Sequence, residues 1–424
     1  MWQGMKKRTL PRPSRFHKTV LWQVCQLIPT HVVGQLARAC GAESRARTFS
    51  CWSQVVAMVY AQVAHALSLN DVCDALRLQS GPLSAIRGAR PPAKNTLSHA
   101  NKVRDYRMAE ELFWHMLGHL QKIAPGFGQG RRGRGLAHRF RASIQIVDAT
   151  VIGLVASCMD WAKHRRRKAA AKCHLRLDLH SFLPRMAIVD AGTADATRAA
   201  EMCAQLQAGE IVIFDKAYVD FPHLWRLHQR GVFWVSRSLE RFRFKVLEQM
   251  PPAKDGRIKR DVIVAPLTYH TRRNYPGPLR LVQAEVEIDG RRETMSFLTN
   301  NLTWAASSVA ELYRCRWQIE VFFKQLKQTV QLADFLGHSA NAVKWQVWTA
   351  LLVNLLMRFL AWRSHWAHSF GRLFTFVRAA LWLRVDLPNL LQRCGTAQGD
   401  IRCIGQPAQA WLPAWTHWPV GQHA

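Results

Sequence analysis

Three acidic residues of the sequence stand where they could hold metal ions. Asp148 directly follows the apolar run IQIV, and Asp215 directly follows the apolar run IVIF. Glu320 lies 105 positions beyond Asp215 (320 − 215), inside the segment YRCRWQIEVFFKQLK. Carboxylate oxygens are the ligands that Mg²⁺ and related hard cations prefer. Two such ions can activate a water and stabilise a leaving oxygen, so the trio predicts metal-dependent cleavage of phosphodiester bonds.

The two apolar runs are typical of buried strands, which would place each aspartate at the C-terminal end of a strand. Strand ends of a mixed sheet open a crevice in which α/β folds collect catalytic groups, so adjacent strands would bring Asp148 and Asp215 together. Taken singly, either aspartate could equally be a turn residue that closes its strand. Other acidic residues nearby lie in contexts that indicate structural roles, and they are Asp160, Asp178, Asp190 and Asp195.

The third carboxylate is expected on a helix. At about 100° per residue, one polar face spans an arc of roughly 60° and comprises Tyr313, Arg316, Glu320 and Lys327. The opposite side would pack against a core, and it comprises Leu312, Cys315, Ile319, Phe322, Phe323 and Leu326. Glu320 would then face a polar cleft. The alternative is a solvated helix face on which Arg316 and Glu320 form an i, i+4 ion pair.

The charge of the chain indicates a polyanionic partner. Its 424 residues include 59 Lys and Arg against 28 Asp and Glu, a formal net charge of +31. Neutralising phosphates releases counterions, so nucleic acid is the commonest partner of such a protein, although a membrane surface or a ribosome would also accept it. A hydrophobic content of 49% excludes a disordered basic tail.

Several features favour a cytoplasmic protein without a membrane partner. Residues 1–18 are basic with no apolar run after them, unlike a secretory signal. The most apolar stretch, 347–362, is interrupted by Asn354 and Arg358 and is short for a bilayer, which favours a buried helix. The ten cysteines include no C-x-x-C pair, so a zinc or redox motif is not indicated.

The segments around these residues predict a multi-domain chain. Helical periodicity over 1–125 indicates a helical N-terminal domain that binds DNA, with Asn95 and Asp105 as the N-caps of two of its helices. A DNA-reading helix pair and an ordinary helical hairpin both fit these two helices. The glycines and arginines of 126–141 predict a basic linker.

Beyond the linker the order of elements is β-β-β-α-β-α-β, from the strands SIQIVDATVI, AKCHLRLDLHS and PRMAIVDAG to the strand GVFWVS. This order predicts an α/β fold of ribonuclease H-like type, a mixed sheet flanked by helices, although a doubly wound sheet with an added hairpin would give a similar pattern. The predicted core comprises 142–236 and 301–365, with a β-rich insertion at 237–300 and a C-terminal region at 366–424.

Two further groups of residues could contact DNA. The cluster HRRRK includes Arg165, Arg166 and Arg167 in the loop after the first strand, where it could approach DNA or be a merely solvated charged loop. An aromatic ring that stacks on an extruded base is physically reasonable. The candidates for such stacking are Tyr269, Tyr275 and Trp304.

The polar face of the predicted helix resembles a known signature. Tyr313, Arg316, Glu320 and Lys327, with two, three and six residues between them, resemble the tyrosine-arginine-glutamate-lysine signature of the insertion-sequence-four family of bacterial DDE transposases. The resemblance spans roughly 49–360.

The contexts of both aspartates are also similar to that family. IVDAT around Asp148 resembles the first catalytic aspartate of the family. FDKAY, residues 214–218, resembles its aspartate, basic residue, glycine, tyrosine motif, with alanine in place of glycine. A β-rich insertion between the second aspartate and the glutamate is a further similarity.

The resemblance implies a DNA transposase that hydrolyses phosphodiester bonds at the ends of its element and transfers those ends to target DNA. It implies a catalytic and metal-binding triad of Asp148, Asp215 and Glu320. Residues implied to contact DNA, as phosphate clamps or strand contacts, are Tyr313, Arg316, Lys327, Lys216 and Tyr218.

The resemblance also implies cofactors and partners. These are two Mg²⁺ ions, for which Mn²⁺ can substitute, and double-stranded DNA, both the terminal inverted repeats and the target. The protein would be bacterial and nucleoid-associated, and would assemble as a homodimer on the DNA ends. The alternatives are a ribonuclease H-like structure-specific nuclease without a joining step, and a catalytically inactive DNA-binding relative of a transposase.

Overall fold

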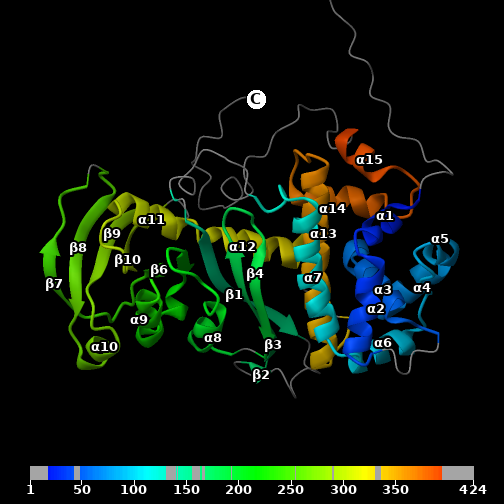
Figure 1. Ribbon diagram of the computed structural model, residues 1–424, viewed down its shortest axis with the longest axis horizontal. Coiled ribbons are helices and arrows are strands. Elements are labelled where there is room, and N and C mark those ends of the chain that lie inside the picture. Colours follow the sequence, from blue (N-terminus) through cyan, green and yellow to red (C-terminus); the bar gives the residue numbers. More distant parts are fainter. Residues whose placement is uncertain are drawn as a thin grey trace, which may run out of the picture. The chain divides into compact units, whose positions relative to one another are not determined.

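The computed structural model describes residues 18–42, 48–129, 140, 142–154, 163–164, 168–191, 193–253, 255–288, 291–329 and 336–393 (Figure 1). These residues form two compact units. The helical unit comprises the described residues of 1–127, 152–170 and 324–404, and the sheet unit comprises the remainder. All three predicted catalytic carboxylates belong to the sheet unit.

One mixed sheet contains the described strands, and most of it belongs to the sheet unit. Among the described residues it has ten strands, in the order β2 (Lys163–His164), β3 (Lys168–Asp178), β1 (Ile144–Leu154), β5 (Ile211–Phe214), β6 (Phe233–Arg237), β10 (Arg291–Thr299), β9 (Leu279–Ile288), β8 (Ile258–Pro266) and β7 (Phe244–Gln249), with β4 (Pro184–Asp190) paired to β3. β1 is parallel to β5 and β5 to β6, whereas β4 is antiparallel to β3. Figure 1 shows β7 at one edge of this array.

Helices complete the sheet unit, and they are α8 (Asp195–Met202), α9 (Phe221–Gln229), α10 (Tyr269–Asn274), α11 (Ala306–Arg314), α12 (Trp317–Lys324) and the short 3₁₀ turn η4 (Lys216–Tyr218). Strand β5 is apolar at every position and wholly buried, as expected for a strand covered on both faces. The element order β1, β3, β4, α8, β5, α9, β6 confirms the predicted α/β fold of ribonuclease H-like type.

The two faces of the sheet are set by the alternation of side chains along its strands. Val147 of β1 and Phe214 of β5 belong to a buried apolar core together with residues of α8 and α9. Because successive side chains of a strand point to opposite faces, the next residues, Asp148 and Asp215, point to the other face. That face carries Glu320. The sequence pattern therefore brings the carboxylates to one side of the sheet.

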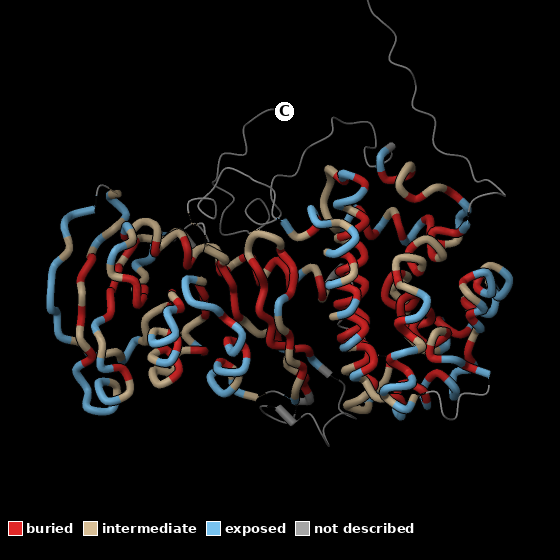
Figure 2. Tube along the Cα trace, viewed as in Figure 1, coloured by how far each residue is buried: buried red, intermediate tan, exposed pale blue. Residues whose placement is uncertain are grey.

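The predicted β-rich insertion continues the same sheet. β10 pairs antiparallel with both β6 and β9, and β8 and β7 follow outward. A buried ion pair joins β8 and β9, in which Nε and Nη2 of Arg280 donate to the two carboxylate oxygens of Asp261 at 2.8 and 2.7 Å. Figure 2 shows that burial decreases toward β7, which is largely exposed at the sheet edge.

The helical unit is built around one long buried helix, α13 (Ala340–Arg363), which confirms the predicted buried helix within 347–362. Its other described helices are α1 (Val20–Gln26), α2 (Thr30–Ala39), α3 (Cys51–Ala64), α4 (Leu69–Leu78), α5 (Ser80–Ser84), α6 (Lys94–Val103), α7 (Arg107–Ile123), η5 (Gln325–Thr329), α14 (Phe370–Ala379) and α15 (Leu387–Arg393). α13, which the sequence groups with the core at 301–365, packs on α3, α6 and α7. The domain boundaries themselves stay a prediction.

Polar contacts of Arg104 tie the turn between α6 and α7 to its neighbours. Nη1 of Arg104 donates to Oε1 of Gln54 at 2.9 Å, and Nη2 donates to the carbonyl of Phe49 at 2.5 Å. The carbonyl of Arg104 accepts from Nε1 of Trp345 at 2.8 Å and from Nδ2 of Asn341 at 2.6 Å. Buried polar groups from α3 and α13 are thereby satisfied at one point.

The N-caps of α6 and α7 differ from the predicted ones. Ala93 is the N-cap of α6, so Asn95 lies inside the first turn, where its side chain makes no cap. Tyr106 is the N-cap of α7. Asp105 precedes this cap, and its Oδ1 accepts a hydrogen bond from the N–H of Arg107 at 2.9 Å. Asp105 therefore satisfies one of the N–H groups in the first turn that have no partner within the helix.

Among the described residues, no single helix combines the length and the apolar composition needed to cross a bilayer. Helices α3 and α4 meet these criteria only as a pair, and the pair is bent by 105°. α3 is itself largely buried within the helical unit.

Candidate active site

Parallel pairing of β1 and β5 brings the two aspartates side by side. Four consecutive residues of β1 pair with four of β5, and the last pair is Val147 with Phe214. In both cases the next residue along the sequence is an aspartate. β5 ends at that point, whereas β1 continues to Leu154. The expectation that Asp148 ends its strand is therefore wrong, because β1 extends beside the equally long β3. Asp215 does end its strand, as predicted.

The segment that carries Glu320 is not one regular helix. The predicted helix over 313–327 is wrong, because a tight turn separates α11 from α12 and a π-helix, η5, follows α12. In that turn the N–H groups of Arg316 and Ile319 donate to carbonyls three residues earlier. The backbone winds more tightly in the turn at Arg316 and more widely in η5 than in a regular α-helix. The angular positions of the side chains shift accordingly, so a regular helical wheel is not a valid basis for placing Lys327 on the face of Glu320.

Arg316 bridges two of the three carboxylates from the turn between α11 and α12. Nη1 donates to Oδ2 of Asp148 and Nη2 donates to Oε1 of Glu320, both at 2.8 Å. The guanidinium carbon lies 5.7 Å from the ring centre of Tyr313 and 5.3 Å from that of Trp317. Nε of Arg316 is buried and has no hydrogen-bond partner among the described residues. The expected i, i+4 pair exists, but the Arg316 side chain is only 10% exposed.

Tyr313 holds the remaining carboxylate. Its hydroxyl donates to Oδ1 of Asp215 at 3.2 Å, and its ring packs on Phe297 of β10 with ring centres 4.9 Å apart. Burial raises the pKa of Tyr313 to about 12, against the opposing effect of Arg316 and with a further contribution from Asp215. The hydroxyl therefore keeps its proton at neutral pH and acts as a donor.

The ionisation of Asp148 is strongly perturbed. Burial raises its pKa to about 6, although Arg316 and the N–H of Ala149, 2.8 Å from Oδ1, favour the ionised form. Asp215 and Glu320 raise the pKa further, because like charges repel. Burial lowers the pKa of Arg316, but the surrounding acidic groups, Asp148 first, more than reverse this and leave the pKa raised. The positive charge of Arg316 therefore offsets only part of the negative charge of the three carboxylates.

The chemistry of the donor set fits a divalent cation. The three carboxylates supply only oxygen ligands, which hard divalent cations prefer. A cation bound among them would lower the pKa of Asp148 toward its usual value. The described part of the chain contains no group of three or more acidic, histidine or cysteine side chains already arranged to bind a metal. Arg316 supplies the positive charge between Asp148 and Glu320 in the present arrangement.

Two residues of the FDKAY motif lie in different surroundings. Lys216 is half-buried, with its side chain 41% exposed, and its Nζ pairs with Oε1 of Glu240 at 3.0 Å. Tyr218 is completely buried in the apolar core, and its hydroxyl lies 3.1 Å from Nδ1 of His174. The turn after Asp215 directs the ring of Tyr218 inward, and its contact with DNA stays a prediction.

The other predicted DNA contacts remain predictions. Lys327 lies in η5 of the helical unit, whereas the three carboxylates belong to the sheet unit. Arg165, Arg166 and Arg167 lie outside the described residues. The candidates for base stacking lie in different surroundings. Tyr275 is fully buried, and Tyr269 is 80% exposed. Trp304 packs against two phenylalanine rings.

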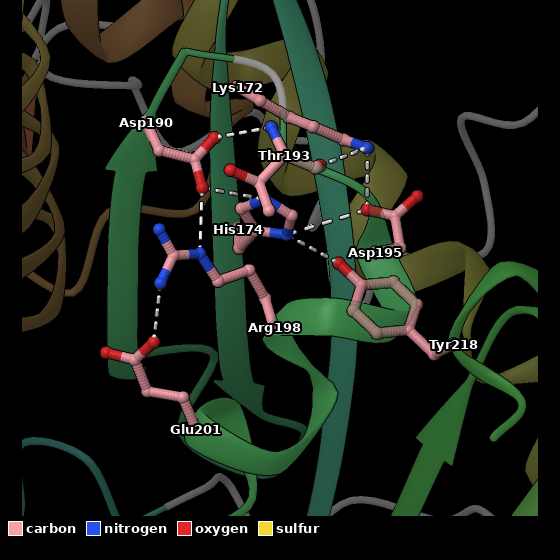
Figure 3. Close-up of polar contacts among 8 residues, drawn as sticks. All are labelled: Lys172, His174, Asp190, Thr193, Asp195, Arg198, Glu201 and Tyr218. Atoms are coloured by element: carbon pink, nitrogen blue, oxygen red, sulfur yellow. Dashed lines mark hydrogen bonds and ion pairs between the residues drawn. The ribbon is translucent and has the colours of Figure 1, made fainter.

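His174 of β3 is a candidate that the sequence analysis missed. Its imidazole is completely buried between Asp190 and Asp195 and lies against Tyr218 (Figure 3). The sequence does contain a sign of it, because Lys172, His174 and Arg176 alternate with the apolar residues Cys173, Leu175 and Leu177 along β3. Polar side chains on a buried strand need partners, which points to acidic neighbours in the fold.

Two family descriptions match the sequence. Residues 139–356, about half of the chain, match the family described as transposase DDE domain. Residues 16–86 match a domain of unknown function, DUF4372.

The similar proteins carry the names of transposases. A Sinorhizobium fredii protein named as a transposase, y4zB, is 30% identical over 289 residues, which cover 67% of this chain and 74% of that protein. A Geobacillus stearothermophilus protein named as a transposase for insertion sequence element IS5377 is 23% identical over 225 residues, 52% of this chain and 58% of that protein. A solved structure, a piggyBac transposase synaptic complex with hairpin DNA, has a TM-score of 0.42 and 10% identity, and the match covers 88% of this chain and 83% of that chain.

The chain therefore belongs to the DDE transposase family, and it is an enzyme of DNA transposition. Within that family it is of the insertion-sequence-four type, as its signature residues predicted. Membership of the family implies dependence on a divalent metal ion.

Proposed function

We propose that this transposase hydrolyses a phosphodiester bond at each end of its element and then joins the released 3′ hydroxyl to target DNA. Asp148, Asp215 and Glu320 are its catalytic and metal-binding residues. The observation that supports this is the convergence of the carboxylates of Asp148, Asp215 and Glu320 on Arg316 and Tyr313, in a chain of the DDE family.

Two Mg²⁺ ions are the proposed cofactor, with Mn²⁺ as a substitute, because the donor set consists of carboxylates. Bound there, they would supply an activated water and stabilise the leaving oxygen. The residues of the chain position the ligands. Tyr313 orients Asp215 through its hydroxyl, and Arg316 sets the separation of Asp148 and Glu320 through its two Nη atoms.

Arg316 has a second proposed role as a phosphate clamp. Its buried Nε–H, which lacks an acceptor among the described residues, is suited to donate to a phosphate oxygen. Once Asp148 and Glu320 turn toward a cation, the planar guanidinium can grip two phosphate oxygens, which an ammonium cannot do.

The proposed partner is double-stranded DNA, both the terminal inverted repeats and the target. A net charge of +31 supports this partner. A homodimer assembles on the two ends, in the bacterial cytoplasm at the nucleoid. Further DNA contacts in this proposal are Tyr313, Lys216, Lys327, Arg165, Arg166 and Arg167.

Cleavage and joining of labelled inverted-repeat DNA in Mg²⁺ test the proposal. Asp148→Asn, Asp215→Asn and Glu320→Gln are each expected to abolish both products and to leave end binding largely intact, because metal ligands are lost while basic contacts remain. Asp255→Asn, which neutralises a carboxylate in the turn between β7 and β8, is the matched control with wild-type rates. Full activity of any of the three variants would reject the triad.

The joining step separates the alternatives. Wild-type protein that cleaves the ends but never joins them would be a nuclease. Protein that binds the ends without cleaving them would be an inactive relative. Joined products that disappear in Asp148→Asn would support the transposase mechanism proposed above.

A further inference from the structure

A cluster of polar side chains, the His174 cluster, lies inside the sheet unit (Figure 3). It connects β3, the end of β4, the start of α8 and η4, and it comprises Lys172, His174, Asp190, Thr193, Asp195, Arg198, Glu201 and Tyr218. His174 and Tyr218 at its centre are completely buried. Burying polar groups costs free energy unless they satisfy one another, so a cluster of this size calls for a functional explanation.

His174 lies between two carboxylates. Its Nε2 is 3.7 Å from Oδ2 of Asp190, and its Nδ1 is 3.5 Å from Oδ1 of Asp195 and 3.1 Å from the hydroxyl of Tyr218. Burial lowers the pKa of His174 despite both carboxylates, so the imidazole is neutral at neutral pH. With its proton on Nε2, toward Asp190, the ring presents Nδ1 as an acceptor for the hydroxyl of Tyr218.

Basic groups hold both carboxylates in place. Nζ of Lys172 pairs with Asp195 at 2.8 Å and donates to the carbonyl of Thr193 at 3.3 Å. Nε of Arg198 donates to Asp190 at 2.9 Å. These ion pairs fix the two carboxylates that flank the imidazole of His174.

Tyr218 connects the cluster to the predicted catalytic aspartate. Its N–H donates to the carbonyl of Asp215 at 3.0 Å, which closes the η4 turn, and its ring joins the apolar core that contains Phe214. Burial raises the pKa of Tyr218, and the nearby carboxylates of Asp195 and Asp148 raise it further. Tyr313 holds the carboxylate of Asp215, whereas Tyr218 holds its backbone.

We propose that Tyr218, held by His174 and Asp195, is a positioning residue that fixes the backbone of Asp215 and so sets the direction from which its carboxylate reaches the metal. This inference rests on the proposed metal-binding role of Asp215. Groups that orient metal ligands typically contribute about 10–100-fold to metal affinity or activity. Loss of the Tyr218 hydroxyl should therefore be felt at the metal and not only in the stability of the fold.

The test compares Tyr218→Phe with Tyr275→Phe in the full-length protein. Both tyrosines are completely buried in the same core, and each substitution removes one hydroxyl. Free Mn²⁺ is measured by electron paramagnetic resonance during titration of each variant without DNA. Tyr218→Phe is expected to weaken Mn²⁺ binding about tenfold and to raise the Mg²⁺ concentration needed for half-maximal cleavage by a similar factor. Tyr275→Phe is expected to match the wild type in both.

A second variant guards against a trivial loss of folding. Asp195→Asn disturbs the cluster from its half-buried side and should weaken Mn²⁺ binding in the same direction, with a urea midpoint close to that of Tyr275→Phe. Mn²⁺ affinities of Tyr218→Phe and Asp195→Asn equal to that of Tyr275→Phe would overturn the inference.

Asp215→Asn separates this inference from the proposed function. Wild-type Mn²⁺ binding by Asp215→Asn would reject the metal site itself. Loss of binding in Asp215→Asn, together with unchanged binding in Tyr218→Phe, would reject only the positioning role.

Discussion

Replacing Arg316 with methionine removes the positive charge that Asp148 and Glu320 share. An unbranched side chain of similar reach then remains between the rings of Tyr313 and Trp317. We expect the free energy of unfolding of the metal-free protein to fall by about 2–3 kcal/mol at pH 7.5 and by much less at pH 6.0.

The size of this loss follows from the ionisation of Asp148. Its pKa is about 6, so protonating it at pH 7.5 costs about 2 kcal/mol, at about 1.4 kcal/mol per pH unit. Without Arg316, the buried carboxyl of Asp148 binds that proton and becomes neutral. The free energy of unfolding therefore falls by no more than the cost of this protonation, about 2 kcal/mol. Glu320 adds roughly 0–1 kcal/mol, because its side chain is 37% exposed and solvent screens its pair. At pH 6.0 the proton is already half bound in the wild type, so the loss falls to about 1 kcal/mol or less.

Urea unfolding in EDTA at pH 6.0 and pH 7.5 measures this difference. Arg257→Met is the matched control, because Arg257 makes two hydrogen bonds to Asp255 but its side chain is 58% exposed. Those hydrogen bonds lower the pKa of Asp255, so it stays ionised at both pH values and the small loss should not change between them. A loss for Arg316→Met that is equal at pH 6.0 and pH 7.5 would refute the reasoning.

Three further outcomes are expected. Asp148→Asn should stabilise the metal-free protein by up to about 3 kcal/mol at pH 7.5, because a carboxyl pKa raised from 3.8 to about 6 costs stability that sets in above pH 4 and is complete above pH 6. Urea curves of variant and wild type should therefore converge toward pH 4. Arg104→Met should cost about 2–4 kcal/mol in the same assay by leaving Gln54 and the carbonyl of Phe49 unsatisfied, whereas the exposed Arg107→Met should be silent. Affinity for end DNA should fall steeply as salt rises from about 50 to 200 mM in a binding titration, and a flat dependence would argue against phosphate contacts.

The core of the fold could be predicted because local patterns agree with the final packing. The run IVIF is buried on both faces as β5, and the alternating segments of the insertion form strands. The pairing of those strands could not be predicted, since β10 joins β6 across about sixty residues of chain. Periodicity shows which residues share a face of a strand and says nothing about which strand lies beside it.

That Asp148, Asp215 and Glu320 lie on one side of the sheet could be predicted from their contexts, but their surroundings could not. A helical wheel assumes one regular helix, whereas the chain tightens at Arg316 and widens after Lys324. The bridge from Arg316 to Asp148 spans 168 positions of sequence, and so depends on the fold as a whole. Tyr218 shows the same limit, because its motif lies beside Asp215 and gives no sign that the ring turns inward.

The four-residue pairing of β1 with β5 has a consequence for how genes of this kind decay. Inserting or deleting one codon within 144–147 or 211–214 would turn one aspartate to the opposite face of the sheet, since side chains alternate along a strand. Exchanging one apolar residue for another in the same stretches keeps the aspartate where it is. Selection on an active copy should therefore tolerate drift in composition here and remove changes in length. Among degenerate copies, an altered length of either stretch would mark the loss of catalysis even where all three carboxylates are still encoded.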